Sequence, residues 1–206
     1  MGRFVNFNMC VLIALLLSLS GGACAKDAKP GVERWPVKTS VMTHSRREEV
    51  SLTDLLALQD VPGVSKNDAR YQSQRIGNFE NADGLHEGDM VTTSGWFHLV
   101  AGETDGDYHI QISNDQNDGN DCLIVEVPKD DAHYTHSAAL RMKFKSIRGW
   151  VRAKLLKDKE PASGGSVMVH PVYVRITGQL FYDCPPSAPM RQNWGIELGR
   201  VLVSSQ

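Results

Sequence analysis

The chain has 206 residues, with 22 basic and 24 acidic side chains and a formal net charge of −2. This length suits one domain of ordinary size with extensions, or at most two small domains. The near balance of charge excludes a strong overall field that would draw in nucleic acid or an anionic membrane surface.

The first 25 residues predict a secretory signal peptide. Arg3 precedes an apolar run at 11–19, and the small residues Ala23 and Ala25 flank Cys24. The run is too short to span a bilayer, which takes about 20 apolar residues. We therefore expect cleavage after Ala25 and export to the periplasm or the extracellular medium, with no transmembrane segment in the mature chain. Removing Arg3 would leave 21 basic and 24 acidic residues, a net charge of −3.

Cys24 also permits a second interpretation, a bacterial lipoprotein anchored through a lipid on this cysteine. The small residues before Cys24 suit it, although Gly21 stands where such signals usually carry an aliphatic residue. Under either interpretation Cys122 and Cys184 are the cysteines left for pairing. Two cysteines in an exported chain predict one disulfide.

Residues 26–88 predict an N-terminal arm with one short helix. Pro30 and Trp35-Pro36 interrupt a polar stretch, and we expect Trp35 to anchor an extended arm to the rest of the fold. Ser51 followed by Asp54 resembles a helix cap, so the leucines at 52, 55 and 56 predict a short helix over 51–59. The stretch 66–89 predicts a loop with at most one short strand.

Residues 89–206 predict a β-domain. A long strand from Met90 alternates so that Phe97 and Leu99 face the core, and Gly95 indicates a bulge or bend. Asp105-Gly106 predicts a hairpin turn into a second strand at 108–113, where positions 108, 110 and 112 face inward. A third strand at 122–127 is apolar on both faces except at Glu126, which indicates that both faces are covered.

A helix over about 132–156, capped by Asp130 and Asp131, and strands at 167–182 and 194–203 complete the pattern. Three strands, a helix and two strands is the element order of the OB-fold, a five-stranded Greek-key barrel. The fold class is therefore mainly β with one long helix, and an open α+β sheet of the same order is the competing interpretation.

The chain also resembles a family of small exported bacterial proteins of uncharacterised function with a predicted OB-like fold. The resemblance rests on four motifs: ERWPVKT at 33–39, DGDYH at 105–109, IVEVP at 124–128 and TGQLFYD at 177–183. The family ends in Glu-Leu-His-Pro, whereas Gly199 and Arg200 follow Glu197-Leu198 here. The resemblance implies export and the fold, and it implies no activity.

The predicted hairpin concentrates groups that could bind a hard cation. Glu103, Asp105, Asp107 and His109 lie within seven residues, and their oxygen and imidazole groups suit a metal. A turn needs the same residue types, so the sequence alone assigns no metal and no cofactor.

A ligand-binding face is predicted on the outside of the first three strands. Alternation places Trp96, His98, His109, Gln111 and Glu126 there, on the face with which OB-folds bind oligonucleotides and oligosaccharides. Trp96, with Tyr173 on a later strand, offers a surface for stacking. The alternative is that the N-terminal arm covers this face and His109 is a buried structural histidine.

No nucleophile motif and no phosphate-binding glycine loop occurs in the sequence. The leading hypothesis is a non-enzymatic exported OB-like binding domain for an oligosaccharide, a nucleic acid or a protein partner. One alternative is an exported metal-assisted hydrolase or nuclease that uses Asp105, Asp107 and His109. The other is a structural envelope protein. An open cluster at His98, His109 and Glu126 favours the first two hypotheses, and a sealed face favours the third.

Overall fold

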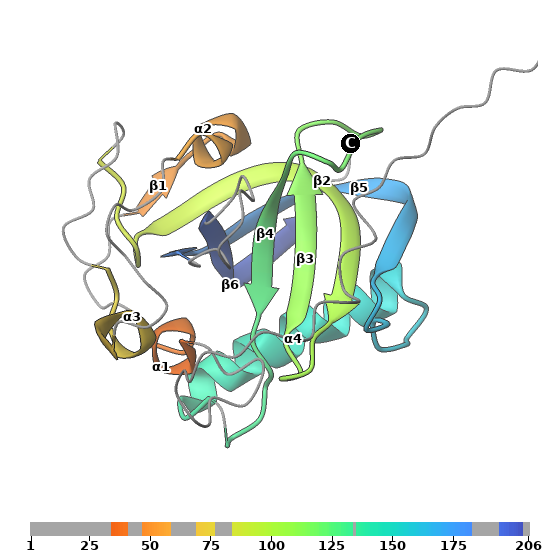
Figure 1. The fold of residues 1–206 in the computed structure, drawn as a ribbon. Helices are drawn as coiled ribbons and strands as arrows, with labels where there is room; N and C mark the ends of the chain where they lie inside the picture. The colour runs from red at the N-terminus through yellow and green to blue at the C-terminus, as the bar shows by residue number, and fades with distance from the viewer. Residues whose placement is uncertain are drawn as a thin grey trace, which may run out of the picture.

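The computed structural model describes residues 34–40, 47–58, 69–76, 84–133, 135–182 and 194–203. The predicted signal peptide, with its cleavage site and Cys24, lies outside the described residues, as does Cys184. The described part is mainly β (Figure 1). No helix in these ranges is long and apolar enough to cross a membrane.

One mixed sheet contains all the described strands: β1 (Arg47–Glu49), β2 (Met90–Gly102), β3 (Tyr108–Ser113), β4 (Cys122–Val127), β5 (Ser166–Tyr182) and β6 (Trp194–Val203). Their order is β1-β2-β3-β4-β6-β5, and β5 also pairs with β2. The pairings therefore run from β2 through β3, β4, β6 and β5 and return to β2. β1 with β2 and β4 with β6 are parallel, whereas the other pairs are antiparallel.

The predicted three-strand meander is confirmed. β2 and β3 are joined at Asp105-Gly106, where Gly106 has a φ of +90° that favours glycine. The expected inward positions of β3 are buried, and the even positions of β5 from 174 to 182 are buried as well. These side chains form the core with the inward residues of β2 and β4.

In β2 the predicted alternation fails after Phe97. The register against both neighbouring strands shifts between Phe97 and Leu99, so the inward position moves from odd to even numbers. Val100 is fully buried in place of Leu99, which is half-buried. The irregularity lies beyond Gly95, so a bulge at Gly95, one of the two features predicted there, is wrong.

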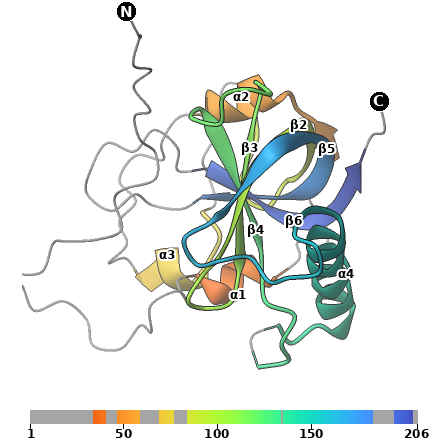
Figure 2. The ribbon, with the colours of Figure 1, turned by 90° about the vertical axis from the view of Figure 1, so that its right-hand side faces the viewer.

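The four described helices are α1 (Trp35–Lys38), α2 (Leu52–Leu56), α3 (Ala69–Ser73) and α4 (Ala138–Leu155). α2 confirms the predicted short helix, because the Ser51 side chain accepts the Asp54 N–H and Leu52 and Leu55 are buried. α2 and α4 lie towards opposite ends of β3 and β4 (Figures 1 and 2). Both helices therefore contribute side chains to the core from the two ends of the strands.

α4 begins six residues later than predicted. Ser137 is its N-cap and accepts the Leu140 N–H. Asp131 instead accepts the His133 N–H with its side chain and the Thr135 N–H with its carbonyl, which makes a turn before the helix. The predicted capping by Asp130 and Asp131 is therefore wrong, since Asp131 satisfies its own loop.

Where the structure describes the predicted arm, residues 35–38 form the helical turn α1 in place of extended chain. Trp35 lies in the helical turn α1 and is 7% exposed. Arg34, fully buried, makes a two-pronged ion pair with Glu87 and donates to the carbonyls of Tyr71 and Tyr182. These hydrogen bonds connect α1 with α3 and with the end of β5. The loop expected over 66–89 is wrong at 69–73, where α3 lies, whereas the described residues 74–76 and 84–89 are loop and turn.

Candidate functional site

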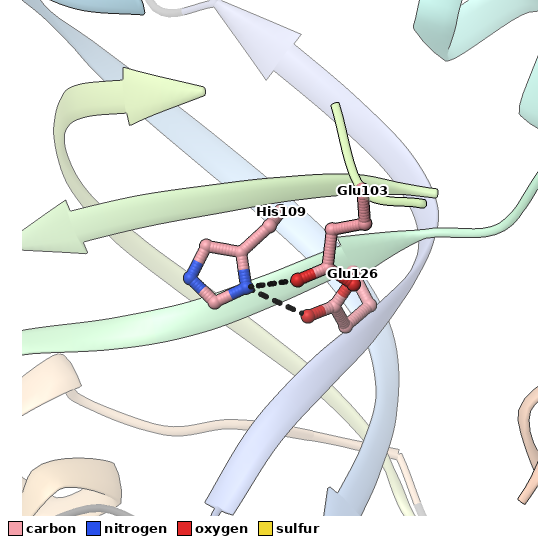
Figure 3. A group of neighbouring side chains, drawn as sticks. All are labelled: Glu103, His109 and Glu126. Carbon is pink, nitrogen blue, oxygen red and sulfur yellow. Dashed lines mark hydrogen bonds and ion pairs between the residues drawn. The ribbon is translucent and has the colours of Figure 1, made fainter. Parts of the chain in front are cut away.

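Three side chains that can bind a cation converge beside the β2–β3 hairpin (Figure 3). His109 Nδ1 lies 3.0 Å from Glu126 Oε1 and 3.5 Å from Glu103 Oε1. One candidate ligand atom from each residue lies within 4.8 Å of the other two. We call these residues the Glu–His–Glu group.

The strand register produces this convergence. His109 on β3 and Glu126 on β4 are directly paired, and each lies between buried neighbours that face the core. Cross-strand partners have Cβ atoms about 5 Å apart, so their side chains meet on one face. Glu103 follows the last residue of β2 and turns back beside His109 through the hairpin.

The Glu–His–Glu group is half closed to solvent. The side chains of Glu126, His109 and Glu103 are 11%, 24% and 38% exposed. Partial burial, reinforced by the charge of Glu126, raises the pKa of Glu103 to about 7. Burial alone would lower the pKa of His109, but its hydrogen bond to Glu126 and the charges of both glutamates raise that pKa overall. The group therefore favours one positive centre between two carboxyls.

Asp105 and Asp107, which the sequence grouped with His109, serve the hairpin instead. The Oδ1 atom of Asp105 accepts the Asp107 N–H, and the Oδ1 atom of Asp107 accepts the Lys129 N–H. Both residues are buried, and among the described residues no donor reaches the second oxygen of either side chain. Burial raises the pKa of Asp107 to about 8, although the Lys38 ammonium at 3.7 Å opposes this rise. That distance is too long for a hydrogen bond, so the ammonium does not cancel the cost of burying the charge.

His98 does not join the Glu–His–Glu group. Its Nε2 lies 2.9 Å from Ser113 Oγ and 2.8 Å from the Asp115 carbonyl. A Cβ on Gly119 would come within 3.0 Å of the His98 ring, so the loop over 114–121 lies against it. The expectation that His98 and His109 form one cluster is wrong, because Ala101 is the residue of β2 that pairs with His109.

Trp96 and Tyr173 form a second group on the same side of the sheet. They are register partners on β2 and β5, with ring centroids 5.1 Å apart at 66° in an edge-to-face arrangement. Both are half-buried, as is Gln111 on β3. The five predicted ligand residues are therefore not one cluster. Trp96 pairs with Tyr173, His98 holds the loop, Gln111 stands apart, and His109 and Glu126 join Glu103.

Sequence reasoning placed Glu103 in a turn and did not connect it with Glu126. The length of the hairpin could have indicated it. The turn between 102 and 108 brings Glu103 back beside His109 of β3, which pairs with Glu126 of β4. Arg34 was also missed, since its partner Glu87 lies 53 residues away.

Comparison with known proteins adds no relative. No family model matches the chain, and no curated protein matches it. The family resemblance drawn from the sequence motifs therefore stays a prediction.

Proposed function

We propose that this chain is an exported, non-enzymatic binding domain with an OB-like architecture. The circular order of strand pairings, with α4 between β4 and β5, supports the OB-like interpretation. The charged start and apolar run before residue 26 support export. The binding face lies on the outside of β2 and the strands paired with it.

The observation that carries the proposal is the half-exposed pair Trp96 and Tyr173. Each ring has a flat face for stacking, and the edge-to-face contact between adjacent strands holds both rings at a low cost in conformational entropy. Arg175 extends the same side of β5 and is 41% exposed where it pairs with Glu49 of β1. The aromatic pair therefore lies beside groups that can donate and accept hydrogen bonds.

The chemistry of this side of the sheet favours an oligosaccharide over a nucleic acid. Glu103 and Glu126 gather acidic groups on it, and the whole chain is slightly acidic. Binding of nucleic acid draws much of its affinity from basic groups that neutralise phosphates. A neutral polar ligand with flat faces suits aromatic rings and hydrogen-bonding neighbours better.

The test is an oligosaccharide array probed with residues 26–206, followed by calorimetry on the best ligand. Trp96→Ala and Tyr173→Ala should each weaken binding about tenfold or more, by analogy with the 1–3 kcal/mol of a stacked base. Tyr173→Phe keeps the ring and should retain most of the affinity. Met142→Ala, at an exposed position on α4, controls for surface substitution.

Circular dichroism of each variant separates a lost contact from a lost fold. Unchanged affinity in both folded alanine variants would place the binding site elsewhere. Binding of single-stranded nucleic acid in place of any oligosaccharide would show that the ligand class is wrong.

A further inference from the structure

We propose that Glu103, His109 and Glu126 form a binding site for a divalent transition-metal ion, with zinc as the ion of best fit. The ligands would be His109 Nδ1 and one oxygen from each glutamate. This site is separate from the aromatic pair of the proposed function, so either proposal can fail alone.

The distances match those between ligands around a tetrahedral metal. Zinc binds imidazole nitrogen and carboxylate oxygen at about 2.0–2.2 Å, which sets neighbouring ligand atoms about 3.3–3.5 Å apart. His109 Nδ1 lies 3.0 Å and 3.5 Å from the two glutamate oxygens. The two glutamate oxygens lie within 4.8 Å of each other, so the carboxylates would draw together around a bound ion.

A hydrogen bond accounts for one of the two contacts that His109 makes, the one with Glu126. Both carboxylates point at the same ring nitrogen, and that nitrogen carries at most one proton to donate (Figure 3). Glu126 is buried, and no donor among the described residues reaches its Oε2. A buried carboxylate oxygen without a partner is costly, and a bound cation would remove that cost.

A bound cation would also favour the ionised form of the carboxyl groups around this site. Four carboxyl groups, those of Glu103, Asp105, Asp107 and Glu126, lie at this hairpin and its partner strand. The Lys38 ammonium approaches this set, at 3.7 Å from Asp107. A divalent ion would balance the two glutamates of the Glu–His–Glu group without further protein ligands.

The ligand set distinguishes among metals. One imidazole and two carboxylates suit zinc, which accepts nitrogen and oxygen together, whereas calcium and magnesium take oxygen ligands in larger number. Three protein ligands leave a fourth position open, and Glu103, the most exposed ligand, lies on the solvent side. Water or a donor atom of a bound molecule would fill that position.

The test uses residues 26–206, first stripped with chelator and then dialysed against zinc. We expect about one retained zinc per chain by elemental analysis, and a rise in melting temperature when zinc is added. Glu126→Gln and His109→Gln should abolish retention. Glu103→Gln, at the exposed edge, should weaken zinc binding by tenfold or more, since even indirect supports of a metal cost 10–100-fold.

His98→Gln is the matched control, because His98 is a half-buried histidine on the neighbouring strand outside the group. This variant should retain zinc as the unmodified chain does. If His109→Gln fails to fold, Glu103→Gln decides the question alone. The proposal would be overturned if the folded unmodified chain retained no zinc. It would also be overturned if folded Glu103→Gln and Glu126→Gln retained as much zinc as the unmodified chain. Equal stabilisation by calcium and zinc would show that the site is not one for a transition metal.

Discussion

At the scale of single residues, Asp107 shows how burial sets the stability of the hairpin. Its side chain is fully buried, and burial raises its pKa from an ordinary 3.8 to about 8. Between these two values the folded chain keeps a proton that the unfolded chain has lost. Folding stability must therefore fall as the pH rises through this window, because ionised Asp107 is disfavoured only in the folded state.

Asp107→Asn should remove this penalty in protein stripped of metal. The asparagine Oδ1 can still accept the Lys129 N–H that Asp107 Oδ1 accepts. At pH 8 the variant should be more stable by about 1 kcal/mol or more, seen as roughly 2–4 °C in melting temperature for a chain of this size. Near pH 4 the gain should shrink towards zero.

Asp118→Asn is the control, since Asp118 is exposed and its Oδ1 also accepts a backbone N–H, that of Asn120. It should show no gain that grows with pH. A variant at 107 that is less stable than the unmodified chain at pH 8 would mean that ionised Asp107 is stabilised by Lys38 after all.

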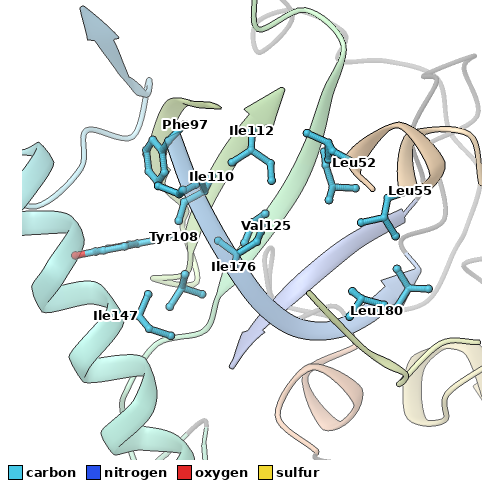
Figure 4. Close-up of a cluster of buried hydrophobic side chains, with 14 of the residues drawn as sticks. Leu52, Leu55, Phe97, Tyr108, Ile110, Ile112, Val125, Ile147, Ile176 and Leu180 are labelled. Atoms are coloured by element: carbon cyan, nitrogen blue, oxygen red, sulfur yellow. The ribbon is translucent and has the colours of Figure 1, made fainter. Parts of the chain in front are cut away.

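At the scale of elements, Gly95 fixes how closely α2 can approach the sheet. A Cβ at this position would lie 2.7 Å from Leu52 Cδ2 and 2.9 Å from the Ser113 carbonyl oxygen. Leu52 points from α2 into the core cluster that contains Ile112 (Figure 4). The leucine end could move, but the Ser113 backbone is held in the β2–β3 pairing.

Gly95→Ala should therefore destabilise the fold by about 1–3 kcal/mol, the usual cost of forcing extra volume into a packed core. Urea unfolding followed by fluorescence measures it. Gly149→Ala is the control, because nothing lies within 4 Å of a Cβ there and alanine favours helix. That change should be neutral or stabilising. An equal loss at both positions would show that the close approach of α2 is not the cause.

Elements with local causes could be predicted from the sequence, and elements with distant causes could not. α2 follows from its Ser51 cap and leucine spacing, and β3 follows from alternation and the glycine turn. The arrangement of α1 and α3 follows instead from the Arg34–Glu87 pair, whose partners are far apart in sequence. The shift of β2 after Phe97 arises from pairing with two neighbours at once, which the alternation of one strand does not reveal.

The same limit applies to the candidate site. Alternation correctly placed His109 and Glu126 on one face, since directly paired strands share a period of two. It wrongly added His98, which lies three residues before Ala101, the residue of β2 that pairs with His109. Glu103 belongs to no strand, so no periodicity could assign it to the group.

At the scale of the whole molecule, β6 lies between β4 and β5 in the sheet. It pairs in parallel with β4 at Ile124 and Gly195, and antiparallel with β5 at Tyr182 and Trp194. The sequence-distant strands β4 and β5 therefore meet only through β6 at this end. A covalent link across the start of β6 would hold these strands in place.

The predicted disulfide between Cys122 and Cys184 would supply that link. Cys122 begins β4, and Cys184 follows the end of β5 by two residues, outside the described part of the chain. One intervening strand separates β4 from β5 by about 10 Å. Two residues of extended chain span at most roughly 7 Å, and a disulfide needs Cα atoms about 4.4–6.8 Å apart, so the spacing in sequence permits the bond.

We expect exported protein that begins at Lys26 to carry this bond, detected by mass spectrometry of unreduced peptides. Closing a loop of this length should stabilise the fold by on the order of 4 kcal/mol, because it restricts the unfolded chain. Reduction, or Cys184→Ser, should therefore lower the urea midpoint, whereas reduction of the Cys184→Ser variant should change nothing further. Two free thiols in folded exported protein would exclude the bond. The backbone pairing of β6 alone would then join β4 and β5 at this end.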